Sequence, residues 1–189
     1  MTEPEIRRRF ELVALPHLDA AYNLARWLTR NDADAEDVVQ DACLRALRYF
    51  DTFRGEQARP WLLQIVRHTC YAWLEKNRPA ELVSLDADET RFDEAYAPES
   101  LEPAAVASRN ADRLRINQAI AALPFVFREV LVLREFEDLS YKDIARIADI
   151  PIGTVMSRLT RARRQLQLAL APGVRPALRS VARPATGGP

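Results

Sequence analysis

Apolar residues recur every three or four positions through most of the chain, which is the spacing of an amphipathic helix. In the first part, this spacing predicts helices over 5–30, with a break near Pro16, over about 36–49, and over 60–77. Pro60 fits the first turn of the last of these, where its missing N–H does no harm. The N-terminal part of the chain is therefore predicted to be helical throughout.

The second part of the chain predicts further helices, over 110–122, 124–136, 140–149 and 153–170. No stretch of useful length shows the alternation of apolar and polar residues that indicates a strand. Gly is scarce, while Ala, Leu and Arg are plentiful, which also favours helices. The predicted fold class is all-α: two small helical domains joined by a flexible acidic linker, the C-terminal one a helix-turn-helix.

Charge is segregated along the chain, although the formal net charge of the 189 residues is zero. Between Pro79 and Asn110, eight acidic residues face two basic ones, and no sustained period is present. No acidic residue follows Asp149, whereas seven arginines do, which suggests a nucleic-acid-binding end. The predicted segments are an N-terminal domain over 1–78, an acidic linker over 79–111, a C-terminal domain over 112–171 and a tail without regular structure over 172–189.

The sequence from Leu139 to Val155 has the layout of a helix-turn-helix. Ser140 is a suitable N-cap, and Asp143 three residues later completes a capping box with Asp in place of Glu. A small inward residue, Ala145, allows close helix approach before a tight turn and a second helix. This motif predicts a DNA-binding domain.

The second helix of this motif divides into an apolar face and a basic polar face. Its inward positions are Val155, Leu159, Ala162 and Leu166. Its outward positions are Gly153, Ser157, Thr160, Arg161 and Arg164, flanked by Arg158 and Arg163. Small polar and guanidinium groups at the centre suit base edges in the major groove, and flanking cations suit phosphates. The alternative is a solvated basic helix, but such a face usually mixes charges of both signs.

The predicted helix over 36–49 carries an apolar residue on its polar face. Asp32 and Asp34 are its expected N-caps. Its core stripe is expected to be Val39, Ala42, Cys43, Ala46, Leu47 and Phe50. Its outward positions are Asp37, Gln40, Asp41, Leu44 and Arg48. Leu44 is either an ordinary surface leucine or an anchor for a partner, and the residues alone leave both interpretations open.

Aromatic residues gather around a polar loop that follows this helix. They are Tyr49, Phe50, Phe53, Trp61, Tyr71 and Trp73, around a loop that contains Arg54, Gly55, Gln57 and Arg59. Most of these rings should belong to the core. The remainder suits a protein that stacks on unpaired bases while arginines follow the nucleic-acid backbone.

What the sequence lacks counts against several protein classes. Cys43 and Cys70 are expected to be buried, reduced thiols. His68 and Cys70 supply only two of the four ligands of a structural zinc, so we expect no metal and no cofactor. The charged N-terminus shows no signal peptide, and no apolar run approaches the roughly 20 residues of a membrane span. We expect a cytoplasmic protein without membrane insertion or a small-molecule substrate.

Together, these motifs resemble the extracytoplasmic-function (ECF) family of RNA polymerase sigma factors. The matching N-terminal motifs are Asp34–Asp41, Leu44–Ala46, Phe53–Gly55, Trp61–Leu62 and Ile65–Arg67. The matching C-terminal motifs are Ala122–Pro124, Arg128, Leu133–Arg134, Leu139–Tyr141, Ile144–Ala145, Gly153–Val155, Ser157–Arg158 and Arg161–Arg163. The resemblance covers about 8–78 and 112–170 in the family's order. His68 and Ala72 stand where the family usually has Asn and Asp. The resemblance therefore does not tell which −10 sequence this chain would recognise.

The resemblance implies a specificity subunit without catalytic activity, which binds core RNA polymerase and promoter DNA and directs transcription initiation. The implied core polymerase-binding residues are Asp37, Gln40, Asp41, Leu44 and Arg48. The implied −10 DNA-binding residues are Phe53, Arg54, Gly55, Gln57, Arg59, Trp61, Gln64, Arg67, His68 and Tyr71. The −35 DNA-binding residues are Thr154, Ser157, Arg158, Thr160, Arg161, Arg163 and Arg164. An anti-sigma factor is an implied further partner.

Two other classes remain as alternatives. A helix-turn-helix regulator with a helical sensor domain would bind duplex DNA without polymerase, usually as a dimer. An enzyme or metal protein has little support, because the chain has two His, two Cys, no Gly-rich phosphate loop and no nucleophile motif. Promoter-specific transcription with core polymerase and no other sigma factor would separate the first alternative from a sigma factor.

Overall fold

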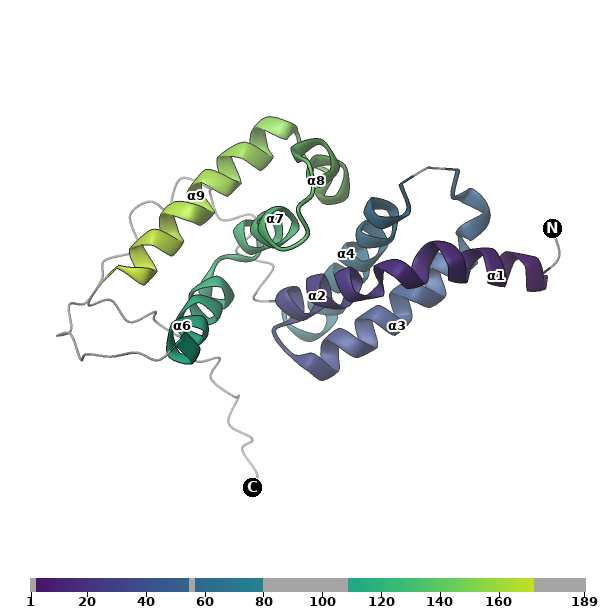
Figure 1. The fold of residues 1–189 in the computed structure, drawn as a ribbon, viewed down its shortest axis with the longest axis horizontal. Coiled ribbons are helices and arrows are strands. Elements are labelled where there is room, and N and C mark those ends of the chain that lie inside the picture. Colours follow the sequence, from purple (N-terminus) through teal and green to yellow (C-terminus); the bar gives the residue numbers. More distant parts are fainter. Residues whose placement is uncertain (1–2, 55–56, 80–108, 172–189) are drawn as a thin grey trace, which may run out of the picture.

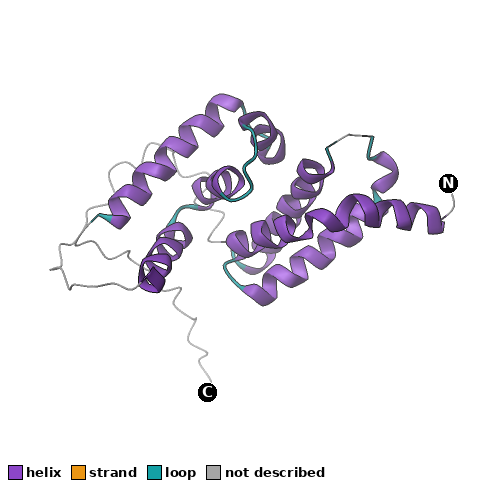
Figure 2. Cartoon of the chain, in the orientation of Figure 1, coloured by secondary structure: helices purple, strands orange, loops and turns teal. Residues whose placement is uncertain are grey.

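The computed structural model describes residues 3–54, 57–79 and 109–171. Across these ranges the chain forms helices joined by short turns and contains no strand, which confirms the all-α prediction (Figure 2). The predictions for Gly55, for most of the acidic linker and for the tail over 172–189 fall outside the described residues.

The N-terminal domain is built from α1 to α4. Its elements are α1 (Glu3–Ala14), a 3-10 turn (Leu15–His17), α2 (Leu18–Thr29), α3 (Asp32–Arg48), a second 3-10 turn (Phe50–Thr52) and α4 (Ala58–Asn77). Pro16 lies in the first turn, as predicted, because a proline inside a continuous helix removes a backbone donor and clashes with the preceding turn. Arg30 ends α2 in the left-handed conformation, with φ 58°. The helices α2, α3 and α4 then pack on one another.

Two details of α3 differ from the prediction. Its N-cap is Asn31, whose side chain accepts a hydrogen bond of 3.0 Å from the backbone N–H of Asp34. Asp32 and Asp34 lie in the first turn instead, where the helix dipole favours negative charge. Val38 rather than Val39 is fully buried, so the core stripe is rotated slightly. As a result Cys43 is only half-buried, and the prediction of two buried thiols holds for Cys70 alone.

The C-terminal domain contains the predicted helix-turn-helix. Its elements are α6 (Arg109–Ala122), α7 (Phe125–Glu135), α8 (Tyr141–Ala148) and α9 (Ile152–Leu170). The hydroxyl of Ser140 caps α8 by accepting a hydrogen bond of 3.1 Å from the N–H of Asp143. Asp149 ends α8 with φ 54°, which turns the chain into α9. Val155, Leu159 and Ala162 of α9 are buried, as predicted.

The two domains pack against each other, with α7 next to α2 and α8 next to α4 (Figure 1). Every residue of α7 from Phe125 to Leu133 is buried, including Arg128 and Glu129. A helix that is buried on all sides must have neighbours on all sides, and α7 has α9 and α8 on one flank and the N-terminal domain on the other. The buried apolar residues of both domains consequently form one continuous cluster.

Candidate functional site

The outward residues predicted on α3 do form one exposed face. The α3 stripe consists of Asp37, Gln40, Asp41, Leu44 and Arg48, all of them exposed. Leu44 is 68% exposed in the middle of this stripe. Asp41 forms an ion pair of 2.9 Å with Arg45, one turn further along the helix. The structure thus presents an apolar side chain surrounded by charged and polar groups.

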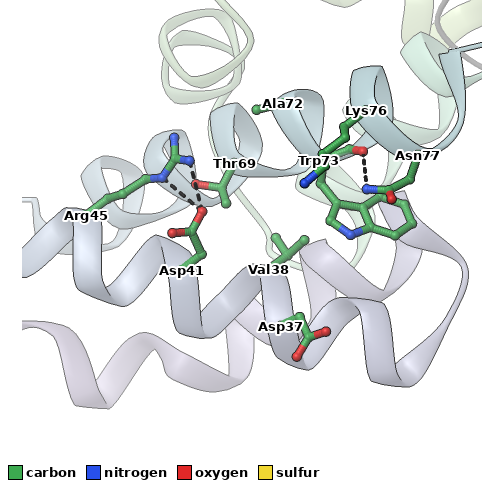
Figure 3. A pocket seen from close by; sticks show the side chains of 9 residues that line it. All are labelled: Asp37, Val38, Asp41, Arg45, Thr69, Ala72, Trp73, Lys76 and Asn77. Carbon is green, nitrogen blue, oxygen red and sulfur yellow. Dashed lines mark hydrogen bonds and ion pairs between the residues drawn. The ribbon is translucent and has the colours of Figure 1, made fainter.

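A groove of about 420 Å³ lies between α3 and α4, beside the α3 stripe (Figure 3). It is lined by Asp37, Val38, Asp41, Arg45, Thr69, Ala72, Trp73, Lys76 and Asn77. Trp73 reaches from α4 toward α3, and its backbone carbonyl accepts a hydrogen bond of 2.8 Å from Asn77. Sequence reasoning missed this groove, because its two walls belong to different helices.

Phe53 and Trp61 lie in an aromatic cluster with Phe10 and Phe50. The rings of Phe53 and Phe50 are stacked with centroids 5.8 Å apart, and Phe53 lies 4.8 Å from Trp61. Phe10 closes the cluster with an edge contact of 5.5 Å to Phe50. Phe53 is half-buried in this cluster, while the neighbouring Arg54 is exposed. One face of the Phe53 ring therefore packs inward, and part of the side chain remains accessible.

Several predicted −10 residues of the N-terminal domain contact the C-terminal domain. Gln57 accepts a hydrogen bond of 2.8 Å from the Arg146 guanidinium, and Gln64 donates one of 3.5 Å to the carbonyl of Arg146. The edge of Tyr71 packs on the ring of Phe125, with centroids 4.8 Å apart. These contacts place Gln57 and Gln64 against α8, and Tyr71 against α7.

Arg67 makes the most deeply buried of the ion pairs between the two domains that the described residues form. Its Nε donates to Oε1 of Glu129 at 2.5 Å, and the Glu129 side chain is 0% exposed, against 11% for that of Arg67. The Arg67 guanidinium also lies over the ring of Tyr71, 4.3 Å from its centroid. Burial raises the pKa of Glu129, and the charge of Arg67 opposes this rise.

Glu137 forms a second junction between the domains. Its carboxylate accepts a hydrogen bond of 2.5 Å from the side-chain amide of Asn23 and forms an ion pair with Arg59. The side chain of Glu137 is only 5% exposed. Beside it, the rings of Trp27 and Phe136 lie 5.3 Å apart.

His68 is exposed, whereas Arg67 and Thr69 beside it on α4 are partly or fully buried. Partial desolvation and the positive charge of Arg67 lower the pKa of its imidazole. The neutral form therefore predominates at neutral pH, since even an unperturbed histidine is mostly neutral there. We conclude that the His68 imidazole carries little charge at neutral pH and can both donate and accept a hydrogen bond.

The outward face of α9 is accessible in its centre. Ser157, Thr160 and Arg164 are exposed, whereas Arg161 is half-buried. The hydroxyls donate to their own helix, Ser157 to the carbonyl of Thr154 at 3.0 Å and Thr160 to that of Met156 at 2.9 Å. They keep their acceptor lone pairs for a partner.

The flanking residues of α9 have neighbours within the protein. Arg163 forms an ion pair of 2.7 Å with Glu135 of α7. Arg158 is half-buried, and its charge opposes the rise in the pKa of the Glu129 carboxyl. A side chain added at Gly153 would meet no atom within 4 Å, so the small size of this residue is not required by packing.

Neither a metal site nor a membrane span is found in the part of the chain that the structure describes. No group of three or more His, Cys, Asp or Glu side chains there could hold a metal ion. No helix there combines the length and the apolar character needed to cross a bilayer.

Comparison with known proteins identifies the family. The family model "Sigma-70 region 2" matches residues 14–79, and "Sigma-70, region 4" matches residues 113–166. The RNA polymerase sigma-H factor of Pseudomonas aeruginosa is 34% identical over 175 residues, which cover 90% of this chain and 91% of that protein. This chain belongs to the sigma-70 family of RNA polymerase sigma factors. The ECF RNA polymerase sigma-E factor of Escherichia coli is 35% identical over 146 residues, 75% of this chain and 76% of that protein, and indicates the ECF type.

One solved structure agrees with the sigma factor assignment, and a second shares the fold. The sigma factor RpoE of Bartonella quintana, in complex with the anti-sigma factor NepR, superimposes with a TM-score of 0.62 at 28% identity, covering 86% of this chain and 94% of that one. CnrH, in complex with the cytosolic domain of CnrY, has the same fold, with a TM-score of 0.60 at 23% identity over 87% of this chain and 88% of that one. The resemblance to the ECF family is thus confirmed, and sigma factors as a family are not enzymes.

Sequence analysis of this sigma factor missed the residues that join its two domains. They are Asn23, Glu129, Glu137 and Arg146, none of which belongs to a predicted site. One signal was available: Arg128 and Glu129 interrupt an otherwise apolar run from Phe125 to Leu133. Charged residues in such a run are buried with partners if the helix is buried on all sides.

Proposed function

We propose that this sigma factor directs promoter-specific initiation through three surfaces. The α3 stripe binds core RNA polymerase, the −10 surface binds the melted −10 element, and the outward face of α9 reads the −35 element. The −10 surface consists of Phe53, Arg54, Gln57, Arg59, Trp61, Gln64, Arg67, His68 and Tyr71, with Gly55 in the same loop. The observation that carries the proposal is the outward face of α9 in a helix-turn-helix of a sigma-70 chain.

The −35 assignment rests on shape and charge together. The first turns of a recognition helix enter the major groove, and Gly153 leaves space there for close approach of the DNA. Ser157 and Thr160 are short and polar, and Arg161 and Arg164 can donate two hydrogen bonds to guanine. Thr154, Arg158 and Arg163 flank this face and would reach phosphates once their contacts within the protein rearrange.

The −10 assignment rests on aromatic rings next to cations. Phe53 and Trp61 offer ring surface for an unstacked base, and Arg54 is exposed beside them. Taking a base out of the stack costs a few kcal/mol, which contacts with the flipped base must offset. His68, neutral at pH 7, supplies a hydrogen-bonding group further along α4.

The polymerase assignment rests on the α3 stripe and the adjoining groove. Leu44 is an apolar anchor with a charged rim, the arrangement of many protein interfaces. The groove between α3 and α4 offers a recess for a partner side chain beside Asp37 and Asp41. Because core polymerase is found in the cytoplasm, this sigma factor would act there, without catalytic activity, cofactor or small-molecule substrate of its own.

An anti-sigma factor is a further proposed partner. Two structures with this fold, those of RpoE and CnrH, were solved in complex with NepR and with the cytosolic domain of CnrY. Such a partner would cover one or more of the same three surfaces in this chain.

Run-off transcription with purified core polymerase tests the proposed function. Core polymerase with this chain and no other sigma factor should produce transcripts from discrete start sites on genomic fragments. Core polymerase alone should not. If the chain instead binds promoter fragments as a dimer without polymerase and yields no run-off product, it is an ordinary helix-turn-helix regulator.

A further inference from the structure

Two large apolar side chains are exposed on the part of α9 that would enter the major groove. Ile152, in the first turn of the helix, is 47% exposed, and Met156, one turn later, is 51% exposed. The exposed residues beside them, Gly153 and Ser157, are small or polar. The proposed reading of the −35 element uses hydrogen bonds and charge, so neither apolar side chain has a role in it.

Ile152 and Met156 belong to one row of side chains along α9, which ends on the outward face. Residues four apart lie on the same ridge of a helix, so the row continues through Thr160 to Arg164. We call Ile152, Met156 and Thr160 the apolar ridge. The hydroxyl of Thr160 donates a hydrogen bond of 2.9 Å to the backbone carbonyl of Met156. Because that hydroxyl is engaged with the helix, the methyl group of Thr160 adds apolar surface to the ridge.

The charge around the apolar ridge favours DNA as its partner. The helix contains no acidic residue, and four arginines lie between positions 158 and 164. In the major groove, the C5-methyl group of thymine is the apolar group that a base pair presents to a protein. Side chains one turn apart on a helix are about 5–6 Å apart at their Cβ atoms, so a methyl group can lie between them. Methionine is unbranched and flexible, which lets it adapt to such a group.

We propose that Met156 is a specificity-determining residue that reads a thymine of the −35 element by contact with its C5-methyl group, with Ile152 and the methyl group of Thr160 on either side. The inference rests on the proposed function of α9. It adds an apolar contact to the polar face, and this contact distinguishes thymine from cytosine by a group that hydrogen bonds do not detect.

Deoxyuridine tests the contact, because uracil differs from thymine only in lacking the C5-methyl group and pairs with adenine in the same way. The binding species is the full chain with core polymerase, and a promoter mapped by run-off transcription supplies the DNA. Each thymine of the −35 element, on either strand, is replaced in turn, and the −10 element is left unchanged. In competition binding, one replacement should weaken binding of the parent about three- to fivefold, as expected for one buried methyl group.

Substitutions at Met156 assign this sensitivity to the apolar ridge. Met156→Ala should bind the thymine promoter about three- to fivefold more weakly than the parent and should no longer respond to the deoxyuridine. Alanine favours helix and the site is exposed, so this variant should fold. Met156→Leu keeps an apolar side chain and should retain most of the sensitivity. Leu168→Ala is the matched control, because Leu168 is 40% exposed in the last turn of the same helix, and it should behave as the parent.

Three outcomes would overturn the proposal. The first is a parent that binds every deoxyuridine promoter as tightly as the thymine promoter, or a mapped −35 element without an A·T pair. The second is a Met156→Ala variant that keeps the parent's sensitivity, or that weakens binding to thymine and deoxyuridine promoters equally, since Met156 would then not contact the methyl group. The third is loss of sensitivity in Leu168→Ala. Failure of the proposed function is a separate result, because it appears as absent promoter-specific binding and run-off product with thymine and deoxyuridine DNA alike.

Discussion

Replacing Gly153, in the first turn of α9, with alanine should have opposite effects on stability and on function. Its surroundings are open, so alanine fits without displacing any atom and should raise the free energy of unfolding by up to about 0.5–1 kcal/mol. The added methyl group would project toward the DNA and weaken −35 binding. Chemical denaturation of Gly153→Ala and run-off transcription from a mapped promoter measure the two effects. A variant that is stabilised and fully active would place Gly153 away from the DNA.

Arg161 and Arg163 lie two residues apart on α9 but should differ in function. Arg161→Ala should lose roughly 1–3 kcal/mol of binding to the preferred −35 sequence and relax the preference at one base pair. Arg163→Ala should weaken binding to all −35 sequences about equally and reduce the salt dependence of binding, because Arg163 would contribute a phosphate contact. Transcription from promoters with each −35 position varied in turn separates the two. Unchanged base preference in Arg161→Ala would show that the outward face is assigned incorrectly.

At the scale of single helices, α3 should be a docking element rather than a structural one. Asp41→Ala with Leu44→Ala should weaken binding to core polymerase at least tenfold, because both side chains are exposed and face the same way. Helix stability should fall little, since the exposed Asp41–Arg45 pair contributes about 0.3–0.5 kcal/mol at most. Fluorescence anisotropy with labelled chain measures the affinity. Glu11→Ala, exposed on α1 and outside the α3 stripe, is the control and should bind normally.

The loop between α3 and α4 should act after the DNA duplex has docked. Phe53→Ala should slow open-complex formation and leave closed-complex affinity unchanged, because unpaired bases are available only after melting. It should also lower the free energy of unfolding by about 1–3 kcal/mol, since half of the ring packs on Phe50 and Trp61. The permanganate reactivity of promoter thymines measures DNA opening. It should be measured well below the temperature at which the variant protein unfolds. If promoter thymines react normally with permanganate in the presence of the folded Phe53→Ala variant, Phe53 contributes to the core but not to DNA opening.

Local sequence patterns predicted the helices and the helix-turn-helix, but not every helix cap or every buried position. Ser140 was identifiable as a cap because its side chain and Asp143 form a local motif. Asn31 was missed because Asp32 and Asp34 are equally good caps by residue type, and only the backbone decides among the three. Val38 and Val39 are equally apolar, so packing against α4 alone decides which of them is buried.

At the scale of the whole molecule, the sequence predicts two domains but not their contact. Arg67 and Glu129 lie 62 residues apart, and although the apolar run around Glu129 indicates that it is buried, nothing in either segment indicates its partner. Arg59 and Gln64 were predicted to bind DNA because their side chains donate hydrogen bonds. For the same reason they suit the carboxylate of Glu137 and the backbone carbonyl of Arg146, which accept hydrogen bonds as a nucleic acid does. Side chains that suit a nucleic acid therefore also suit an acidic or polar protein face.

The length of the chain between the domains should limit which promoters can be used. Deleting residues 82–106 leaves four of the 29 residues between Pro79 and Arg109, a reach of about 13 Å. That is far below the distance between the −35 and −10 positions, which lie about 25 base pairs apart, or roughly 85 Å at about 3.4 Å per base pair. Run-off transcription from a promoter with both elements should therefore fall at least tenfold. Binding to core polymerase and to a −35 duplex, measured separately, should persist, because each requires one domain.

The matched control replaces 82–106 with the same residues in scrambled order, which preserves length and charge. This chain should transcribe like the parent if the segment acts through its reach. Loss of transcription in the scrambled chain would show that the segment's own sequence matters. Normal transcription in the deletion variant would mean that the two elements are not read at once, and the three-surface function would have to be revised.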